Sequence, residues 1–501
     1  MTSSRKRLSS PKVVIIGAGP GGLAAGMLLS KTGADVTILE ARNTVGGRTS
    51  SLSEQGFTFD LGPTFFLYPD VLKGIYSSCG FDMDKEIEMV RLKDHYKLTF
   101  EGRGEVVARG SEDFMEKQFS NVNSEDVGGF RRFMEDNRKK FSTFNRVLQK
   151  PFNSIKDLMD PQLLSALPYL RPGKSVESDL RTFFKDERLR LACAFQSKYL
   201  GMSPSNCPSI FTILSYLEYE YGIFHPKGGC GAVSRSMADM AKRLGARIKL
   251  SEPVESIEFE GSRAKSVVTN NDRYDCDALV INADFAHTMQ KLVPNHLRKR
   301  WSDQEIEKKK YSCSTFMMYL GLNKTIPDLN HHSIFLSKDY KGNLEDIEKN
   351  HTLSDNPSFY VCNPCVTDPS MAPENKSSFY VLVPVTHRNG ELDWEKNRDA
   401  FRSVVMNQLE KIGLSDLESS IEYEKILTPQ TWENKYNIFK GAVFNLAHSL
   451  DQMLFRRPQN RFKELDGVYL VGGGTHPGSG LPVIYESAKI SSRLIQEDYG
   501  I

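Results

Sequence analysis

The sequence predicts an α/β protein built around a parallel sheet, with a second domain inserted into it. Near the start of the chain, a β-branched run at 12–16 is followed by a glycine-rich turn, a helix-forming segment and a second apolar run at 35–39. Strands that are apolar along their whole length are typical of a parallel sheet with both faces covered. A similar run at 467–471 lies near the other end of the chain and also leads into a glycine-rich turn. The sheet is therefore expected to draw its strands from segments far apart in the sequence.

The composition of the 501 residues is that of a folded globular protein. There are 65 basic and 63 acidic residues, which gives a net charge of +2, and 39% of the residues are hydrophobic. This balance excludes an intrinsically disordered chain. No basic stripe is interleaved with aromatic residues, so we expect no binding of nucleic acid. Eight cysteines are too few for a disulfide framework in a chain of this length.

The sequence offers little sign of a metal site or a membrane span. Cys362 and Cys365 form a CxxC without a second pair, and among ten scattered histidines only His331 and His332 are adjacent. We therefore expect no metal. No stretch reaches the ~18 apolar residues that a spanning helix needs. A soluble protein, or one lying on a membrane surface, in a reducing compartment is expected.

The first glycine-rich turn fits the pattern GxGxxG at Gly17, Gly19 and Gly22. Gly17 allows the tight turn, Gly19 lets the backbone approach a pyrophosphate, and Gly22 lets the helix pack closely on the strand. The helix N-terminus offers free amides to the phosphates. Glu40, 18 residues after Gly22, is placed to accept hydrogen bonds from a ribose diol, and an acidic residue there argues against NADP. The arrangement predicts an adenine dinucleotide, either FAD or NAD; the alternative is a purely structural turn.

A second glycine pair favours FAD. After Glu40 the chain reads ARNTVGGRT, in which Gly46 and Gly47 precede Arg48. Two glycines and an arginine after the ribose-binding strand can form a clamp for an anion. The segment resembles the second fingerprint of the flavin amine oxidase and phytoene desaturase superfamily. This resemblance implies that Gly46, Gly47 and Arg48 bind FAD, with the arginine beside its phosphates.

Two further segments are similar to parts of the same superfamily that contact FAD. FDLGPT at 59–64 resembles the family's FDxGPT segment near the flavin, which implies that Gly62, Pro63 and Thr64 contact the cofactor. A later helix followed by short strands resembles the second FAD segment of the superfamily, where the backbone at the position of Val254 meets the adenine.

The strand at 467–471 leads into GGGTHPGSGLP at 472–482, and a helix is expected from about 483 to 496. A glycine-rich turn before a helix can aim amides at the negative charge that develops on the N1/C2=O edge of a reduced flavin. The segment resembles the C-terminal signature of the bacterial phytoene desaturase family, which includes carotenoid desaturases, isomerases and saturases. It departs from that family at 482–487, where Glu486 resembles the ending of the amine oxidases, so the shape of the substrate above the flavin stays open. The cofactor contacts implied here are Gly473, Gly474, Thr475, Gly480 and Leu481.

In chain order, these segments predict a discontinuous Rossmann-type FAD-binding domain with an inserted α+β substrate-binding domain, like that of the flavin amine oxidases. The FAD-binding domain is expected at 1–84, 225–300 and 463–501. The substrate-binding domain, which could also associate with a membrane, is expected at 85–224 and 301–462.

Two apolar clusters fall largely within the inserted domain. Leucines and a tyrosine at 163–170, followed by the basic Arg171, could form a surface helix that dips into a bilayer. Aromatic residues gather between 208 and 226, where they form either a lipophilic site or ordinary core: Phe211, Tyr216, Tyr219, Tyr221 and Phe224.

The resemblance implies an FAD-dependent carotenoid desaturase. Such an enzyme forms a conjugated C=C bond in a linear or monocyclic polyene by hydride transfer to flavin N5 and loss of a proton. We expect a 1′-hydroxycarotenoid 3,4-desaturase first and a phytoene desaturase second. A carotenoid isomerase or saturase of the same family stays open, as does a flavin amine oxidase. A more distant alternative is a non-enzymatic prenyl-lipid carrier similar to the GDP dissociation inhibitors.

The cofactor is expected to carry the chemistry, because the sequence has no HExxH, GxSxG or Walker A motif. Asp60, His476 and Glu486 are candidate bases for the proton loss, because they lie in or beside the flavin motifs. The expected partners are a lipophilic polyene, a membrane surface, and oxygen or a quinone as electron acceptor, since no second nucleotide motif appears. The expected location is the cytoplasm, peripheral to the cytoplasmic membrane.

Overall fold

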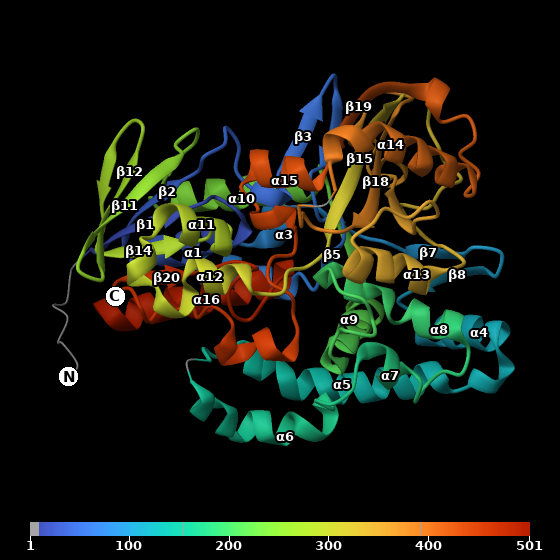
Figure 1. Ribbon diagram of the computed structural model, residues 1–501, viewed down its shortest axis with the longest axis horizontal. Coiled ribbons are helices and arrows are strands. Elements are labelled where there is room, and N and C mark those ends of the chain that lie inside the picture. Colours follow the sequence, from blue (N-terminus) through green and yellow to red (C-terminus); the bar gives the residue numbers. More distant parts are fainter. Residues whose placement is uncertain (1–9, 153, 391) are drawn as a thin grey trace.

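The computed structural model describes residues 10–152, 154–390 and 392–501. Two lobes lie side by side in Figure 1. One contains a parallel sheet with its covering helices, and the other contains a larger mixed sheet above a layer of helices.

The parallel sheet forms from the three predicted runs and two further strands. In spatial order its strands are β10 (Arg247–Lys249), β2 (Asp35–Leu39), β1 (Lys12–Ile16), β14 (Ala278–Ile281) and β20 (Val468–Leu470). Every pairing in the sheet is parallel. Along β1, Val13 and Ile15 face one hydrophobic core while Val14 and Ile16 face another. Both faces are therefore buried, which explains why the strands are apolar throughout.

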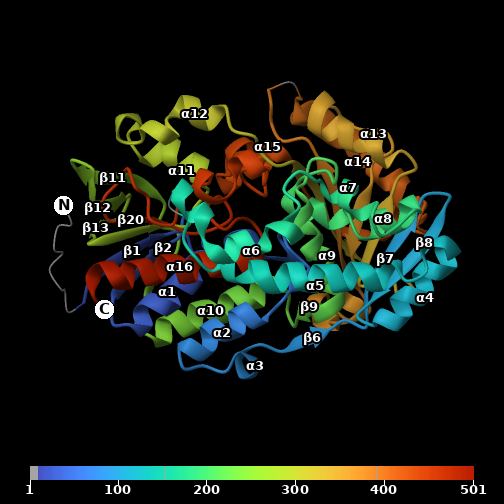
Figure 2. The same ribbon diagram turned by 90° about the horizontal axis from the view of Figure 1, so that it is seen from below.

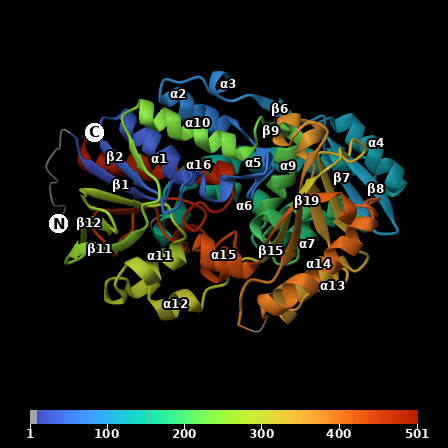
Figure 3. The ribbon, with the colours of Figure 1, turned by 90° about the horizontal axis from the view of Figure 1, so that it is seen from above.

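Helices cover one face of this sheet, and an antiparallel meander with further helices covers the other (Figure 3). The first face carries α1 (Pro20–Lys31), α2 (Asp70–Ser78), α10 (Cys230–Arg243) and α16 (Leu481–Tyr499). The second face carries β11 (Val254–Glu260), β12 (Arg263–Thr269), β13 (Arg273–Asp275) and α11 (Phe285–Leu292). Helix α16 begins earlier than the sequence predicted, since Pro482 is accepted in the first turn of a helix.

The second lobe is built on a seven-stranded sheet. Its strands in spatial order are β19 (Ile421–Leu427), β15 (Ser314–Leu322), β18 (Ser377–Val385), β17 (Phe359–Cys362), β16 (His332–Leu336), β7 (Asp94–Phe100) and β8 (Gly104–Arg109). Only the β16–β7 pairing is parallel among these described strands. Helix α14 (Trp394–Glu410) packs its buried residues against this sheet.

A layer of helices lies below that sheet, and Figure 2 shows α5 running along the underside with α6 beside it. The layer contains α4 (Glu112–Val122), α5 (Gly129–Leu148), α6 (Pro161–Leu170), α7 (Val176–Leu180), α8 (Glu187–Ala192) and α9 (Ile213–Tyr221). Fully buried Lys140 on α5 ties the layer together: its Nζ lies 3.2 Å from Asp179 Oδ2 and donates to Thr212 Oγ1 at 2.8 Å. In the part of the chain that is described, no helix combines the length and the apolar character needed to cross a bilayer.

Short elements complete the chain. They are β3 (Ser51–Glu54), β4 (Phe57–Asp60), β5 (Phe66–Leu67), α3 (Met83–Glu86), β6 (Met89–Arg91), β9 (Ile223–Pro226), α12 (Asp303–Glu307), α13 (Tyr340–Glu345) and α15 (Pro429–Tyr436). Strands β5, β9 and β6 form a small sheet, and β3 pairs with β4.

The strands of the two large sheets come from different parts of the sequence. All strands of the parallel sheet fall within 1–84, 225–300 and 463–501, and those of the seven-stranded sheet fall within 85–224 and 301–462. The domain boundaries themselves stay a prediction.

Replacing Gly22 with alanine should destabilise the protein. A Cβ at this position would lie 2.2 Å from the carbonyl oxygen of Gly17 and 2.9 Å from Asn282 Nδ2. We expect the free energy of unfolding to fall by about 1–3 kcal/mol or more, with loss of dinucleotide uptake. Thermal unfolding and flavin absorbance after gel filtration measure the two effects.

Gly74→Ala is the matched control. Gly74 is also a helical glycine, but a Cβ there meets nothing within 4 Å. Alanine should raise the stability by about 0.5–1 kcal/mol at this exposed position. Equal destabilisation by the two substitutions would contradict the close packing at Gly22.

Candidate active site

A single cavity of about 980 Å³ joins the two lobes. One part, the cofactor cleft, lies at the carboxyl edge of the parallel sheet and is lined by Gly17, Gly19, Glu40, Arg48, Gly473 and Gly480. The other part, the apolar chamber, lies between the seven-stranded sheet and the helical layer and is lined by Phe65, Phe141, Phe144, Phe195, Phe211 and Leu217. A ligand in the cleft and a ligand in the chamber would therefore share one space.

The glycine turn at the start of α1 forms the floor of the cofactor cleft. Gly17 has a φ of +99°, and its amide donates to the carbonyl of Leu39 at 2.8 Å. A Cβ at Gly19 would lie 3.1 Å from Asn282 Nδ2, so the backbone is close to its neighbours here. No side chain caps the N-terminus of α1. Its first amides are therefore free to bind an anionic group in the cleft.

Glu40 lies at the end of β2, on the wall of the cleft. Its Oε2 accepts from the Ala18 amide at 2.8 Å, and its Oε1 accepts from the Arg42 amide at 3.0 Å. Burial raises the pKa of Glu40, and these two hydrogen bonds oppose that shift. Each carboxylate oxygen retains a lone pair, so the side chain can still accept hydrogen bonds from a ribose diol.

Arg48 is half-buried in the wall of the cleft, where it donates to the carbonyl of Val443. With the Asn445 amide oxygen turned toward it, Arg48 donates to that oxygen from Nη2 and Nη1 at 3.0 and 3.1 Å. The Asn445 nitrogen then donates to Asp284 Oδ2 at 2.7 Å. Burial lowers the pKa of Arg48, and the charge of Asp284 opposes this. A guanidinium held at the wall in this way can pair with a phosphate.

The Gly46–Arg48 segment packs directly on the first glycine turn, and the Gly62–Thr64 segment packs on Arg48. The Gly46 amide donates to the carbonyl of Ala18 at 2.8 Å. A Cβ at Gly62 would lie 2.7 Å from the carbonyl oxygen of Arg48, so only glycine fits. Tyr380 OH donates to the Gly62 carbonyl at 2.7 Å and fixes this loop from the seven-stranded sheet.

The glycine-rich segment at 472–482 also contributes residues to the wall of the cleft. Helix α16 begins after Gly480 without a side-chain cap, so the amides of its first turn are also available. The Ser479 amide donates to His448 Nε2 at 2.9 Å, which holds the loop in place. Two uncapped helix N-termini, the carboxylate of Glu40 and the half-buried guanidinium of Arg48 thus converge on one cleft. This donor and acceptor set fits FAD.

Most of the predicted cofactor contacts line the cavity. These are Gly17, Gly19, Glu40, Gly47, Arg48, Gly62, Pro63, Thr64, Val254, Gly473, Gly474, Gly480 and Leu481. Gly22, Gly46 and Thr475 are not part of the lining. Gly22 packs against the backbone of the glycine turn, and the Gly46 amide donates to the Ala18 carbonyl of the same turn. The Thr475 carbonyl accepts a hydrogen bond from Arg457 Nε at 3.2 Å.

Asp60 and His476 point away from the cavity. Asp60 Oδ1 lies 3.4 Å from the Gly231 amide at the start of α10, and burial raises its pKa to about 7. His476 Nε2 lies 2.9 Å from the Lys150 carbonyl oxygen, and burial lowers its pKa to about 4. Neither side chain lines the cavity, so the geometry gives no support to either as a base. Glu486 does line it, with its Oε1 3.0 Å from Lys489 Nζ.

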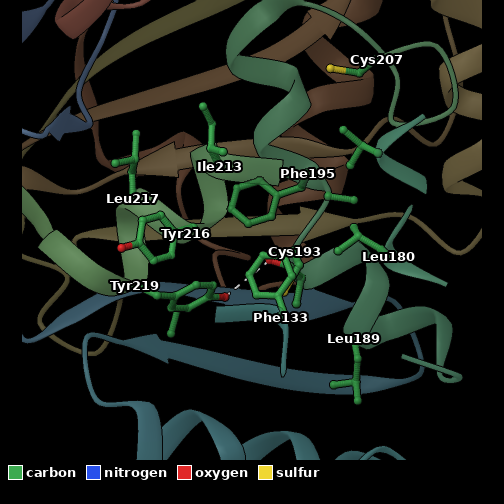
Figure 4. Packing of buried hydrophobic residues seen from close by; sticks show 14 of the residues in the cluster. Phe133, Leu180, Leu189, Cys193, Phe195, Cys207, Ile213, Tyr216, Leu217 and Tyr219 are labelled. Atoms are coloured by element: carbon green, nitrogen blue, oxygen red, sulfur yellow. Dashed lines mark hydrogen bonds between the residues drawn. The ribbon is translucent and has the colours of Figure 1, made fainter. Parts of the chain in front are cut away.

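The sequence left open whether the aromatic residues at 208–226 form a lipophilic site or ordinary core, and most of them do not line the cavity. Of the predicted aromatic stripe only Phe211 lines the cavity, while Tyr216 and Tyr219 belong to the core (Figure 4). Ile213 and Leu217 of α9 line it too. They are one helical turn apart and point to the same side in Figure 4.

Other chamber residues were not predicted from the sequence. Helix α5 supplies Phe141, Phe144 and Leu148, whose helical spacing was a usable signal. In the cleft, Asn282 and Asp284 were also missed. They directly follow β14, and polar residues at the carboxyl end of a parallel strand commonly face a ligand.

A buried histidine cluster supports the wall near Thr64. Strand pairing places Cys362 opposite His332, and ligand atoms of His331, His332 and Cys362 lie within 4.8 Å of one another. The sequence did not indicate this grouping. His332 Nδ1 is 2.7 Å from Tyr360 OH, which is in turn 2.7 Å from Thr64 Oγ1. Burial lowers the pKa of His331 to about 3 and lowers the pKa of His332 well below its ordinary value, so both rings are neutral.

Asp60→Asn should keep the cofactor and change the pH dependence of stability. The pKa of Asp60 is about 7 in the folded protein against an ordinary value of 3.8, so the unfolded chain loses this proton at lower pH. Its contribution to stability is therefore full below about pH 4 and is lost as the pH rises through about 7. Asparagine should flatten this decline in melting temperature, whereas Asp113→Asn at an exposed position should not. A loss of activity with retained FAD would instead assign Asp60 to the reaction.

The chain matches a known family over nearly its whole length. The model of that family, described as flavin containing amine oxidoreductase, matches residues 20–496. A 4,4′-diapophytoene desaturase (4,4′-diapolycopene-forming) of Methylomonas sp is 44% identical over 98% of this chain and 96% of its own. A carotenoid 3,4-desaturase of Haloarcula japonica is 30% identical over 98% of this chain and 99% of its own.

Solved structures share the fold. A variant of putrescine oxidase whose cofactor binding was redesigned superposes with a TM-score of 0.63, at 14% identity over 98% of this chain and 99% of its own. At this identity the likeness concerns the fold alone. Together with the two desaturases, it confirms the predicted fold and the resemblance to the bacterial phytoene and carotenoid desaturases. The chain therefore belongs to the flavin-containing amine oxidoreductase family, within its carotenoid desaturase group, and is an FAD-dependent oxidoreductase.

Proposed function

We propose that this protein is a carotenoid desaturase that oxidises an acyclic polyene beside FAD. The observation that carries this proposal is the continuity of the cavity: the polar cofactor cleft opens directly into the apolar chamber. A long hydrocarbon is suited to a chamber walled by aromatic and aliphatic side chains, because burying its surface is favourable. The two desaturases among the relatives support the same activity.

Which carotenoid the enzyme oxidises is a more specific proposal than the desaturase activity itself. One relative is named for the 3,4 bond of a carotenoid and another for diapophytoene, and the second is the more similar of the two. Both names are consistent with a carotenoid substrate. We keep a hydroxylated acyclic carotenoid, desaturated at its 3,4 bond, as the leading proposal, and phytoene as the second.

In the proposed reaction, different residues would position the polyene, exclude water and remove a proton. Bound FAD would supply the two-electron oxidation by accepting a hydride from an allylic carbon. Residues of the chamber would exclude water and hold the polyene extended above the cleft. The carboxylate of Glu486, which lines the same cavity, would take the proton from the neighbouring carbon. Its charge acts on Tyr68, which also lines the cavity, so the carboxylate lies near the aromatic wall.

Oxygen or a quinone is proposed as the final electron acceptor. The chain contains no second nucleotide-binding motif that would hold NAD or NADP beside the flavin. A small or lipid-soluble oxidant could reach the cavity by the route that the polyene uses.

We also propose that residues 155–170 hold the protein on a membrane surface. Large hydrophobic side chains are exposed here: Ile155 (65%), Met159 (69%), Leu164 (41%) and Leu167 (42%). In Figure 1, α6 lies at the lower edge of the molecule, away from both large sheets. Exposed Lys156 lies within the segment and exposed Lys174 lies just after it, and both would favour anionic lipid headgroups.

This segment also lies next to the chamber. Helix α6 packs on α5, and α5 carries Phe141 and Phe144 of the chamber wall. A polyene dissolved in the bilayer could therefore enter the chamber from this side.

Product analysis tests the function. FAD-loaded protein is incubated with oxygen and liposomes that carry phytoene, lycopene, a hydroxylated acyclic carotenoid or a monocyclic carotene, and products are separated by chromatography. A product two hydrogens lighter with a red-shifted spectrum supports a desaturase and identifies its substrate. A spectral shift without a change in mass indicates an isomerase. No reaction with any polyene, together with oxidation of small amines, would overturn the proposal.

Glu486→Gln should slow proton removal while leaving the shape of the site unchanged. We expect the rate of product formation in a single turnover to fall by about 10²–10⁴-fold, the usual contribution of a general base. Lys489→Met, which removes only the partner of Glu486, is the control and should have a smaller effect. An unchanged rate in Glu486→Gln would eliminate this residue as the base.

Replacing Met159, Leu164 and Leu167 together with serine should weaken binding to liposomes. Co-sedimentation of the FAD-loaded protein with anionic vesicles should fall several-fold, because the apolar face that enters the bilayer is lost. The matched control replaces exposed Leu250, Val366 and Leu450, at 42%, 43% and 50% exposure, with serine. Equal co-sedimentation of the two triple variants would rule out this docking face.

A further inference from the structure

A lysine side chain interrupts the apolar chamber. Lys198 lies in a short helix, Phe195–Leu200, and lines the cavity next to Phe195 and Tyr199. Its Nζ is buried and has no hydrogen-bond partner within the described residues. A buried amine without a partner is costly, whether it is charged or neutral.

The nearby carboxylates are already engaged by other groups. Glu348 accepts from the side chains of Ser203 and Asn206 at 2.7 Å each. Glu218 accepts from Gln196 Nε2 at 2.8 Å and from Tyr96 OH at 3.1 Å. Neither forms an ion pair with Lys198, so no residue that the structure describes satisfies the amine.

A second unsatisfied donor lies on the same part of the wall. The OH of Tyr340, at the start of α13, is buried, lines the cavity and has no hydrogen-bond partner in the described chain. The helix that carries Lys198 lies beside Cys313, because the Cys313 amide donates to the carbonyl of Gly201 at 3.0 Å, and Cys313 also lines the cavity. The Tyr340 hydroxyl is close enough to Cys313 for the thiol to contribute to its raised pKa. Two donors from different elements therefore lie in the wall of one largely apolar chamber.

We propose that Lys198 is a specificity-determining residue that, together with Tyr340, binds a hydroxyl or carbonyl oxygen at one end of the polyene. The proposal rests on the proposed function and narrows its substrate class to oxygenated polyenes. An ammonium has three donors and no acceptor, so an oxygen lone pair is what it needs. A hydrocarbon end would leave both donors unsatisfied in the closed chamber. Sites built around such polar groups reject analogues that lack the matching atom.

The groups that hold the cofactor are separate from this pair. The cleft already supplies free amides at the starts of α1 and α16 and the guanidinium of Arg48. Lys198 instead belongs to the helical segment that carries Phe195 of the chamber wall. The oxygen that it binds is thus assigned to the substrate.

The test compares two acyclic polyenes with the same carbon skeleton, one a hydrocarbon and one with a terminal hydroxyl. The wild-type FAD-loaded protein should have a kcat/KM at least about tenfold higher for the hydroxylated polyene. Lys198→Met keeps the length of the side chain but removes the donors, so the preference should disappear through loss on the hydroxylated substrate. Lys198→Arg keeps a charged donor and should retain most of the preference. Tyr340→Phe should reduce it.

The outcomes separate the inference from the function on which it rests. Wild-type protein that desaturates both polyenes equally, or a preference unchanged in Lys198→Met, overturns the inference alone. A shifted flavin spectrum in Lys198→Met, with equal loss on both substrates, would assign the amine to the flavin and also overturn it. A wild-type protein that desaturates neither polyene overturns the proposed function.

Discussion

Close backbone packing at the carboxyl edge of the parallel sheet is the constraint on which the rest of the structure depends. Asn282 Nδ2 donates to the carbonyl of Gly17 at 3.0 Å, and a Cβ at Gly22 would come within 2.2 Å of that same oxygen. The Gly46 amide is bound to the carbonyl of Ala18. Segments far apart in the chain therefore approach one another so closely that a side chain at Gly22 would not fit. The space left between them is a cleft walled by backbone amides, which suits the phosphates of a dinucleotide.

The second constraint is the change of polarity along one cavity. Glu40 and Arg48 supply charge at the cleft, whereas rings such as Phe141 and Phe195 supply apolar surface in the chamber. A polar cofactor and a lipophilic substrate can each bind where their surfaces match, and they meet where the two regions join. Glu486 lies on the wall of this shared space, and Lys198 introduces polarity again within the chamber. The fold thus defines both where oxidation occurs and which part of a substrate can be recognised.

Sequence reasoning located the cleft because its chemistry is encoded locally. Spacing within GxGxxG and the distance from Gly22 to Glu40 follow from one βαβ unit, so no long-range contact had to be known. The direction in which a side chain within these motifs points could not be predicted from the sequence. Asp60 and His476 lie inside flavin motifs, yet one faces α10 and the other faces Lys150. The chamber as a whole could not be predicted either, because its wall is assembled from α5, α9 and the seven-stranded sheet by contacts between distant segments. Only local signals, such as the helical spacing of apolar residues along α5, were available for parts of it.

Anaerobic mixing tests the central claim most directly, namely that polyene and flavin react in one continuous cavity. FAD-loaded protein is mixed without oxygen with liposomes that contain an acyclic carotenoid, while flavin absorbance and polyene mass are followed together. We predict that the oxidised flavin bleaches by one equivalent for each double bond formed and recovers when oxygen is admitted. Formation of product without bleaching would contradict this account, as would bleaching by small amines but by no polyene.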